Sequence, residues 1–142
     1  VRAAVLGLRR AKSMVIDPAD ENRRSVGSFF TNPIVAAADA DRVVALALEH
    51  GLATSAADVP RFAVPDGRAK LAAAWLIERA GFVRGERRGS VGISSRHALA
   101  LVHHGGGTTR ELLAFAHEIA DRVQERFGVA LQPEPTLVGV RW

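Results

Sequence analysis

Ser28 is the first residue whose setting could support chemistry. It lies in the stretch SVGSFFTNP, after Gly27 and before Phe29 and Phe30. A glycine lets other backbone approach closely, and two phenylalanines can exclude water, so a serine held there could donate or accept a proton in a dry site. The same pattern is typical of a serine in a half-buried strand, and the residues alone favour that structural interpretation.

Glu134 is the second such residue. It lies between Pro133 and Pro135 in the stretch QPEPT. The two prolines restrict the backbone and hold the carboxylate away from regular structure. A rigidly presented carboxylate suits catalysis, but glutamates are mostly exposed in folded proteins. The pattern alone therefore favours an exposed loop residue.

A third stretch, His103 and His104 followed by residues 105–107, all glycine, suggests a metal or phosphate site. Adjacent side chains on a strand point to opposite faces, so the two rings cannot grip one ion. No second pair of ligands has metal-site spacing, and no phosphate-binding loop ending in Gly-Lys-Ser/Thr is present. We therefore interpret this stretch as a turn flanked by polar residues.

The elements that must position these residues follow from apolar periodicity and from start and stop signals. Thr108 and Glu111 form a capping-box pattern, Asp39 is a predicted helix cap, and Gly51, Gly81 and Gly128 are helix stops. We expect a helix at 1–13, a short strand and a second extended piece within 26–35, a helix at 39–50, a helix within 68–81, a strand at 97–103, a helix at 108–128 and a final strand at 136–142. This order predicts an α+β domain, with a small mixed or antiparallel sheet of three or four strands covered by helices.

The composition limits the classes of function. Hydrophobic residues make up 48% of 142 residues, which is enough for one domain with a core. No apolar run reaches membrane-spanning length, so we expect no membrane partner. With no cysteine, the chain has neither a disulfide nor a thiolate metal site. That fits a reducing compartment, and we expect a cytoplasmic protein.

The charge is basic, with a formal net charge of +4. Lys12 and Lys70 are the only lysines among 19 basic residues, and arginine suits paired contacts with phosphate or carboxylate. An anionic ligand is therefore plausible. Nucleic acid is disfavoured, because the arginines are scattered and few aromatic rings accompany them.

Three stretches in this order identify a family: SVGSFFTNPIV, PDGRAKLAAAWLIERAGFVRG, and SSRHALALVHHGGGTTRELLAFAHEIADRVQERFGVALQPEPTLVG. Together they resemble the C-terminal, substrate-binding domain of UDP-N-acetylenolpyruvoylglucosamine reductase, also called UDP-N-acetylmuramate dehydrogenase. The resemblance covers nearly the whole chain. It implies that residues 1–142 form a single C-terminal substrate-binding domain, with the N-terminal FAD-binding region outside this chain.

The resemblance implies a flavoenzyme of peptidoglycan synthesis. NADPH reduces FAD, which passes a hydride to UDP-N-acetylglucosamine enolpyruvate and yields UDP-N-acetylmuramate. The implied partners are this substrate and the FAD-binding region, and the chain alone is expected to be inactive. The alternative is a stand-alone basic module that binds a nucleotide sugar or nucleic acid without redox chemistry.

The resemblance also implies roles for residues. Ser28 matches the family's proton donor, and Glu134 matches a glutamate that stabilises the enolate-like state through a hydrogen bond while its carboxyl is protonated. Five further residues are implied substrate ligands: Asn32 and Lys12 at the phosphates, Arg9 and Arg10 near the uridine, and Lys70 at the nucleotide, where a surface role on its helix is an equal alternative. Phe62 and Ala74 depart from the family, which has Tyr and Gly there.

The role implied for Glu134 is specific: its protonated carboxyl donates a hydrogen bond near the substrate carboxylate and so stabilises the enolate-like state. The role implied for Ser28 is to protonate that state from close range, since a neutral hydroxyl is too weak an acid to act on a less basic group.

Overall fold

The computed structural model describes all 142 residues. Its strands form two separate antiparallel sheets. The larger sheet has the strand order β1-β7-β6-β5, and the smaller has the order β2-β4-β3. The helices are α1 (Arg2–Ala11), α2 (Ala37–Glu49), α3 (Ala73–Arg79) and α4 (Thr109–Phe127), with a 3-10 turn at Ala56–Asp58. The strands are β1 (Ser25–Ser28), β2 (Ile34–Val35), β3 (Arg61–Ala63), β4 (Ala69–Leu71), β5 (Arg87–Arg88), β6 (Val91–Ile93) and β7 (Ala100–His103). The predicted α+β class is confirmed, and the second sheet is an addition to it.

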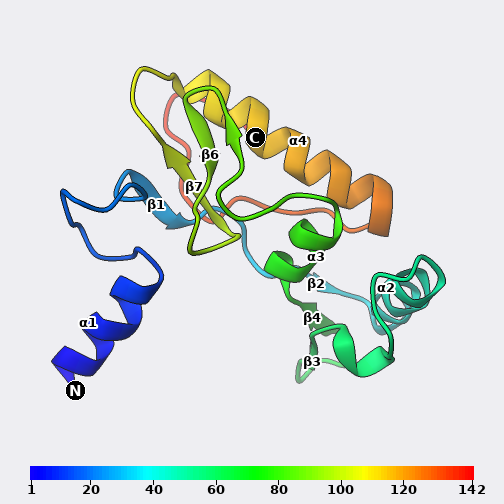
Figure 1. Cartoon of the computed structure of the whole chain (residues 1–142). Helices are drawn as coiled ribbons and strands as arrows, with labels where there is room; N and C mark the ends of the chain where they lie inside the picture. The colour runs from blue at the N-terminus through cyan, green and yellow to red at the C-terminus, as the bar shows by residue number, and fades with distance from the viewer.

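Helix α4 covers one face of the larger sheet, where it contacts β6 and β7 and also reaches α2 and α3 (Figure 1). Its buried side chains recur every three or four residues and therefore form one face: Phe115, Ala116, Ile119, Val123 and Phe127. This face is the centre of a core that continues through α2, α3 and the inner side of both sheets.

The predicted signals at both ends of α4 are confirmed. The Thr108 hydroxyl accepts a hydrogen bond from the Glu111 N–H at 3.2 Å, and the Thr108 N–H donates to the Glu111 carboxylate at 2.6 Å. Each bond satisfies an N–H that the first helical turn leaves without a partner. Gly128 ends the helix in the left-handed conformation, with φ of +67°.

The helix predicted within 68–81 begins later than expected. Ala69–Leu71 forms β4, the central strand of the smaller sheet, and α3 starts only at Ala73. Ala, Lys and Leu are good helix formers, but pairing with β2 on one side and β3 on the other decides their conformation here. Helix α2 also starts earlier, at Ala37, and Asp39 does not cap it.

The final strand predicted at 136–142 is absent, and this prediction was wrong. The end of the chain instead packs through Trp142, whose ring centroid lies 6.1 Å from that of Phe29 and 6.0 Å from that of Phe30. The same ring stacks on His117 of α4 at 4.1 Å. Aromatic packing, without a strand ladder, therefore holds this segment against the core.

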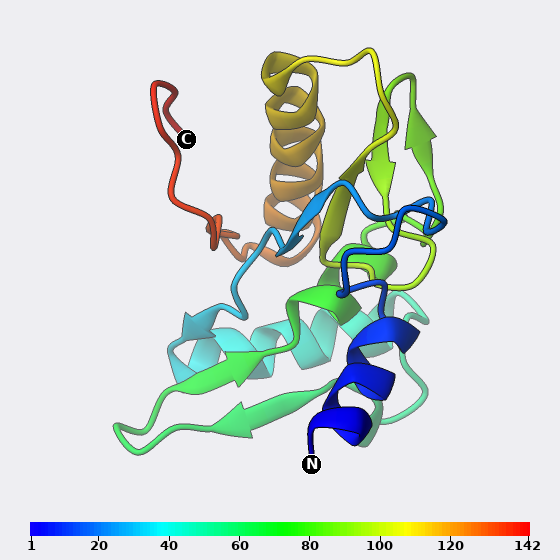
Figure 2. The same cartoon turned by 90° about the vertical axis from the view of Figure 1, so that its left-hand side faces the viewer.

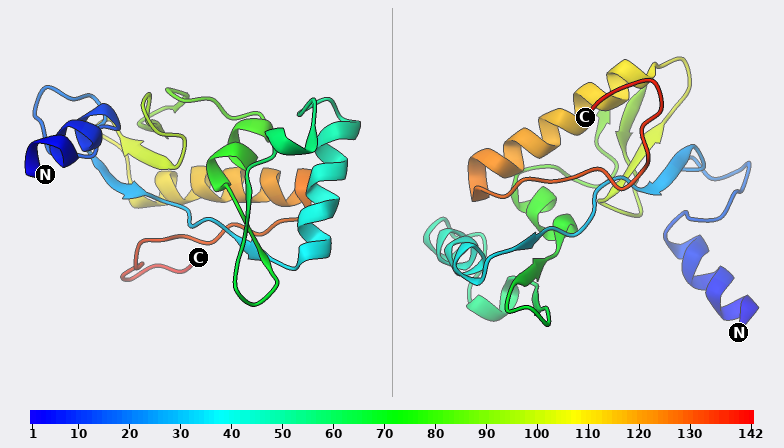
Figure 3. Two further views of the ribbon diagram at one scale, coloured as in Figure 1. Left: turned by 90° about the horizontal axis from the view of Figure 1, so that it is seen from below. Right: turned by 180° about the vertical axis from the view of Figure 1, so that it is seen from behind.

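Helix α1 stands apart from both sheets (Figures 1 and 3). None of its residues is buried, and Val5 and Leu8 expose 46% and 72% of their surface. Its position therefore depends on the loop that joins it to β1. No helix in the structure combines the length and apolar composition that crossing a membrane requires.

Candidate functional site

Glu134 is fixed beside β1 by backbone pairing. Its N–H donates to the Phe29 carbonyl at 2.7 Å, and the Thr31 N–H donates to the Gln132 carbonyl at 3.0 Å. Phe30 and Pro133 form an antiparallel bridge between these two bonds. The stretch around Glu134 therefore runs antiparallel to the stretch that follows Ser28.

Ser28 is placed where β1 passes from the surface into the core. It lies opposite Ala100 of β7, and the Phe29 N–H donates to the Leu99 carbonyl at 2.7 Å. Phe29 is only 2% exposed, whereas Ser28 itself is half-buried. The core thus anchors the residue after Ser28 and leaves its hydroxyl accessible.

Gly27 sets the direction of the Ser28 side chain. The register between β1 and β7 shifts between Ser25 and Ser28, and Gly27 has φ of +86°. This left-handed conformation is easy for glycine and strained for other residues. The irregularity is a β-bulge, which commonly redirects a side chain beside an active site.

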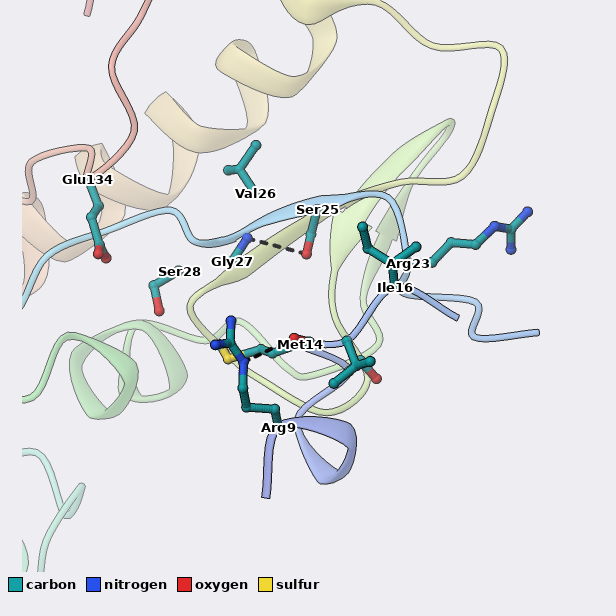
Figure 4. Close-up of a pocket in the computed structure, with 11 residues that line it drawn as sticks. Arg9, Met14, Ile16, Arg23, Ser25, Val26, Gly27, Ser28 and Glu134 are labelled. Atoms are coloured by element: carbon teal, nitrogen blue, oxygen red, sulfur yellow. Dashed lines mark hydrogen bonds between the residues drawn. The ribbon is translucent and has the colours of Figure 1, made fainter. Parts of the chain in front are cut away.

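Ser28 and Glu134 line one open pocket of about 450 Å³. Both polar groups point the same way into it, and the guanidinium of Arg9 faces them from the last turns of α1 (Figure 4). The remaining lining residues come from the loop after α1 and from β1: Ser13, Met14, Val15, Ile16, Arg23, Ser25, Val26 and Gly27.

The polar groups at the centre of this pocket are available to a ligand. Neither the Ser28 hydroxyl nor the Glu134 carboxylate has a hydrogen-bond or ion-pair partner in the structure. Arg9 uses its Nε to donate to the Met14 carbonyl at 3.3 Å, which leaves the outer guanidinium nitrogens without a partner. The pocket therefore contains a hydroxyl, a carboxyl and a guanidinium that form no hydrogen bonds with one another. Such groups remain free to bind an anionic ligand.

The other residues implied by the resemblance do not line this pocket. The side-chain oxygen of Asn32 accepts a hydrogen bond from the Ala73 N–H at 2.9 Å and so holds the start of α3. Lys12 and Arg10 are exposed at the end of α1. Lys70 lies in the smaller sheet, in register between Ile34 and Phe62.

Lys12 is nevertheless close to the connection between β6 and β7. The pKa of His97, in that connection, lies below its ordinary value because the ring is partly buried and because the positive charges of Lys12 and Arg84 disfavour its protonation. The Nδ1 of His97 accepts a hydrogen bond from the Leu99 N–H at 3.1 Å. The same connection contacts β1 next to Ser28, because the Leu99 carbonyl accepts the hydrogen bond of the Phe29 N–H.

His103 ends β7, and His104 leads into the glycines at 105–107, where the chain turns as predicted. The Nδ1 of His103 accepts a hydrogen bond from the Gly105 N–H at 3.1 Å. No group of three or more His, Asp or Glu side chains in the structure is arranged to hold a metal ion.

The loop that forms one wall of the pocket was not predicted from the sequence. Residues 14–16 carry no motif, and the segment that contains Arg23 has no apolar periodicity. Their position depends on contacts between distant segments, so periodicity and turn signals contain no information on it.

The sequence of this chain matches a known protein family. Residues 17–138 match the model described as "UDP-N-acetylenolpyruvoylglucosamine reductase, C-terminal domain". The chain belongs to this family. The family match spans β1, the whole sheet system and Glu134, and therefore includes both residues at the centre of the pocket.

Members of the reductase family from several bacteria are similar over nearly all of this chain. A UDP-N-acetylenolpyruvoylglucosamine reductase from Thermobifida fusca is 50% identical over 140 residues, which are 99% of this chain and 39% of the relative. One from Saccharopolyspora erythraea is 51% identical over 96% of this chain and 37% of its own length. One from Corynebacterium diphtheriae is 46% identical over 99% and 36%. The chain thus spans less than two fifths of these relatives.

Proposed function

We propose that this chain is the substrate-binding and proton-donating domain of a UDP-N-acetylenolpyruvoylglucosamine reductase, in which residues 1–142 act as one C-terminal unit. The observation that carries the proposal is the shared pocket of Ser28 and Glu134. These residues are far apart in the sequence, and the family resemblance implies that both act on the same substrate. A pocket that brings them together supports that reading.

The proposed reaction saturates the enolpyruvyl double bond of the UDP sugar. A hydride adds to the methylene carbon, and negative charge then develops on the neighbouring carbon and its carboxylate. A proton must be added to that carbon to complete the lactyl group of UDP-N-acetylmuramate. FAD, once reduced by NADPH, would supply this hydride when bound.

Ser28 donates the proton in this scheme. A serine hydroxyl is a very weak acid, but an enolate-like carbon is basic enough to accept its proton at hydrogen-bond range. The hydroxyl has no partner in the structure, so its proton can be directed at the ligand. After the transfer, the half-buried oxygen takes a proton from solvent.

Glu134 stabilises the developing charge while its carboxyl is protonated, by donating a hydrogen bond to the substrate carboxylate. Arg9 faces the same pocket (Figure 4) and provides positive charge for an anionic group of the ligand. The resemblance associates Arg9 with the uridine, whereas the pocket that Arg9 shares with Ser28 supports a contact nearer to the reacting group.

The diphosphate and nucleotide contacts extend beyond the pocket. Lys12 and Arg10 lie just past Arg9 on the exposed end of α1, and Asn32 retains its amide N–H groups while its oxygen holds α3. Lys70 stands between Ile34 and Phe62 on the smaller sheet, where an aromatic ring and a cation together suit a nucleobase and its phosphates.

FAD fits the residues of this pocket poorly. One common way to hold a dinucleotide is a glycine-rich turn that leads into a helix N-terminus. The only helix that lines the pocket is α1, and it contributes Arg9 near its C-terminal end. We infer that FAD is held by another region, which would face the exposed side chains of Ile16 and Val26 at the rim.

An NMR titration of the chain tests this function. UDP-N-acetylglucosamine should shift the amide signals of Arg9, Ser28 and Glu134, and FAD should leave them unchanged. Single-stranded RNA serves as the control for unspecific binding to a basic protein. Shifts with RNA but none with the UDP sugar would contradict the proposal, as would a yellow chain that retains FAD through gel filtration.

A further inference from the structure

The loop between α1 and β1 is pinned by a buried asparagine. Asn22 is 3% exposed and is one of only three buried polar residues, with Ser13 and Ser94. Buried polar side chains are usually retained with their hydrogen bonds satisfied, so the partners of Asn22 show what it holds in place.

Asn22 joins two distant segments. The Ser95 N–H donates to the Asn22 side-chain oxygen at 3.0 Å, and the Asn22 amide donates to the Ser95 hydroxyl at 3.0 Å. The same amide lies 3.3 Å from the Ser13 hydroxyl and 3.3 Å from the Asp20 carboxylate of its own loop. Ser95 belongs to the connection between β6 and β7, and Ser13 follows the end of α1, so one side chain links the end of α1 to the larger sheet. Figure 2 shows the loop between α1 and β1 running beside that connection.

Ser13 is the residue at which the chain turns away from α1. Its φ of +55° makes it the only non-glycine residue with a positive φ. This conformation is uncommon for serine, and it persists where surrounding contacts hold it. The Met14 N–H returns to the Arg9 carbonyl at 2.8 Å and completes the turn.

These bonds matter because α1 has little else to hold it. No residue of α1 is buried, while Ser13, Met14 and Arg9 all line the pocket that contains Ser28. The direction of α1, and with it the place of the Arg9 guanidinium, therefore depends on the turn that Asn22 secures.

We propose that Asn22 is a positioning residue: through Ser13 and Ser95 it fixes α1 so that Arg9 faces Ser28 across the pocket. The part of this inference that concerns ligand binding rests on the proposed function. The part that concerns the position of α1 does not, because it follows from the hydrogen bonds and from the exposure of the helix.

Spin labels measure the position of α1 directly. The chain has no cysteine, so the substitutions Val5→Cys in α1 and Glu125→Cys in α4 provide the only two sites for spin labels. We expect a narrow distance distribution in the otherwise unchanged chain and a clearly broader one after Asn22→Ala. Asp58→Ala is the matched control, because Asp58 also pins a loop by accepting hydrogen bonds from Thr54 and Ser55.

Ser95→Ala keeps the test decisive if Asn22→Ala does not fold. It removes the hydroxyl that accepts the hydrogen bond of the Asn22 amide and leaves the bond from the Ser95 N–H to Asn22 in place. The link is therefore weakened but not lost, and we expect a broadening smaller than that of Asn22→Ala. Unchanged distributions in the folded variants of this pair, or equal broadening by Asp58→Ala, would overturn the proposal.

A titration with UDP-N-acetylglucosamine separates the positioning role from the proposed function. Asn22→Ala should weaken binding about tenfold, as the loss of one well-placed charged contact would, while Asp58→Ala leaves it unchanged. If the unchanged chain binds no UDP sugar, the proposed function fails, and the label distances alone then decide the role of Asn22.

Discussion

The N–H of Glu134 donates to the carbonyl of Phe29 at 2.7 Å. This single backbone bond sets Glu134 beside the residue that follows Ser28, and it explains how two side chains from opposite ends of the chain reach one pocket. Because the bond is between backbone groups, substitutions of either side chain should change the chemistry of the pocket more than its shape.

Replacement of Glu134 tests the charge state in which it acts. In a chimeric reductase, with this chain in place of the matching residues of the Thermobifida fusca relative, Glu134→Ala should reduce the rate of flavin oxidation by substrate roughly 10²–10³-fold, as is typical for loss of one group that stabilises a developing oxyanion. Glu134→Gln should retain more activity, since its neutral amide still donates a hydrogen bond. Equal losses in the two variants would argue against a protonated donor.

Gly27→Ala tests the bulge that directs Ser28. At φ of +86°, alanine should cost about 1–2 kcal/mol of unfolding free energy and should also slow the proton transfer by moving the hydroxyl. Urea denaturation measures the first effect. Gly7→Ala is the control, because Gly7 is helical with open space around it, and there alanine should stabilise the helix by about 1 kcal/mol.

The lowered pKa of His97 predicts a pH dependence of stability. Burial and the charges of Lys12 and Arg84 lower this pKa in the folded chain, so the unfolded chain takes up the proton more readily. The stabilising contribution is therefore complete above the unfolded pKa of about 6.5 and is lost as the pH falls through the folded value. His97→Asn, which keeps an acceptor for the Leu99 N–H, should flatten the dependence of unfolding free energy on pH below about 6.5. Parallel curves for the two proteins would contradict this assignment.

The sequence predicts the elements whose signals are local. The capping box at Thr108 and the stop at Gly128 locate α4, because both act within one helical turn. The strand Ala69–Leu71 was missed because its conformation depends on pairing with β2 and β3, which local propensity does not record.

The residues of the site also fall into two groups: those that the sequence predicts and those that only the folded structure reveals. Family resemblance identified Ser28 and Glu134 as candidates, while the residues themselves favoured ordinary structural roles. Ser13 and Asn22 had no signal at all, because their importance comes from a hydrogen-bonded contact with Ser95 in a distant connection. Long-range contacts of this kind require the folded structure.

The most direct test of the central claim follows the two half-reactions of the chimeric reductase by stopped-flow absorbance after Ser28→Ala. Reduction of FAD by NADPH should proceed at the rate of the unchanged chimera, because Ser28 has no role in it. Reoxidation of the flavin by UDP-N-acetylglucosamine enolpyruvate should be almost abolished, because the substrate has no proton donor. Reoxidation at an unchanged rate would contradict the assignment of Ser28 as that donor.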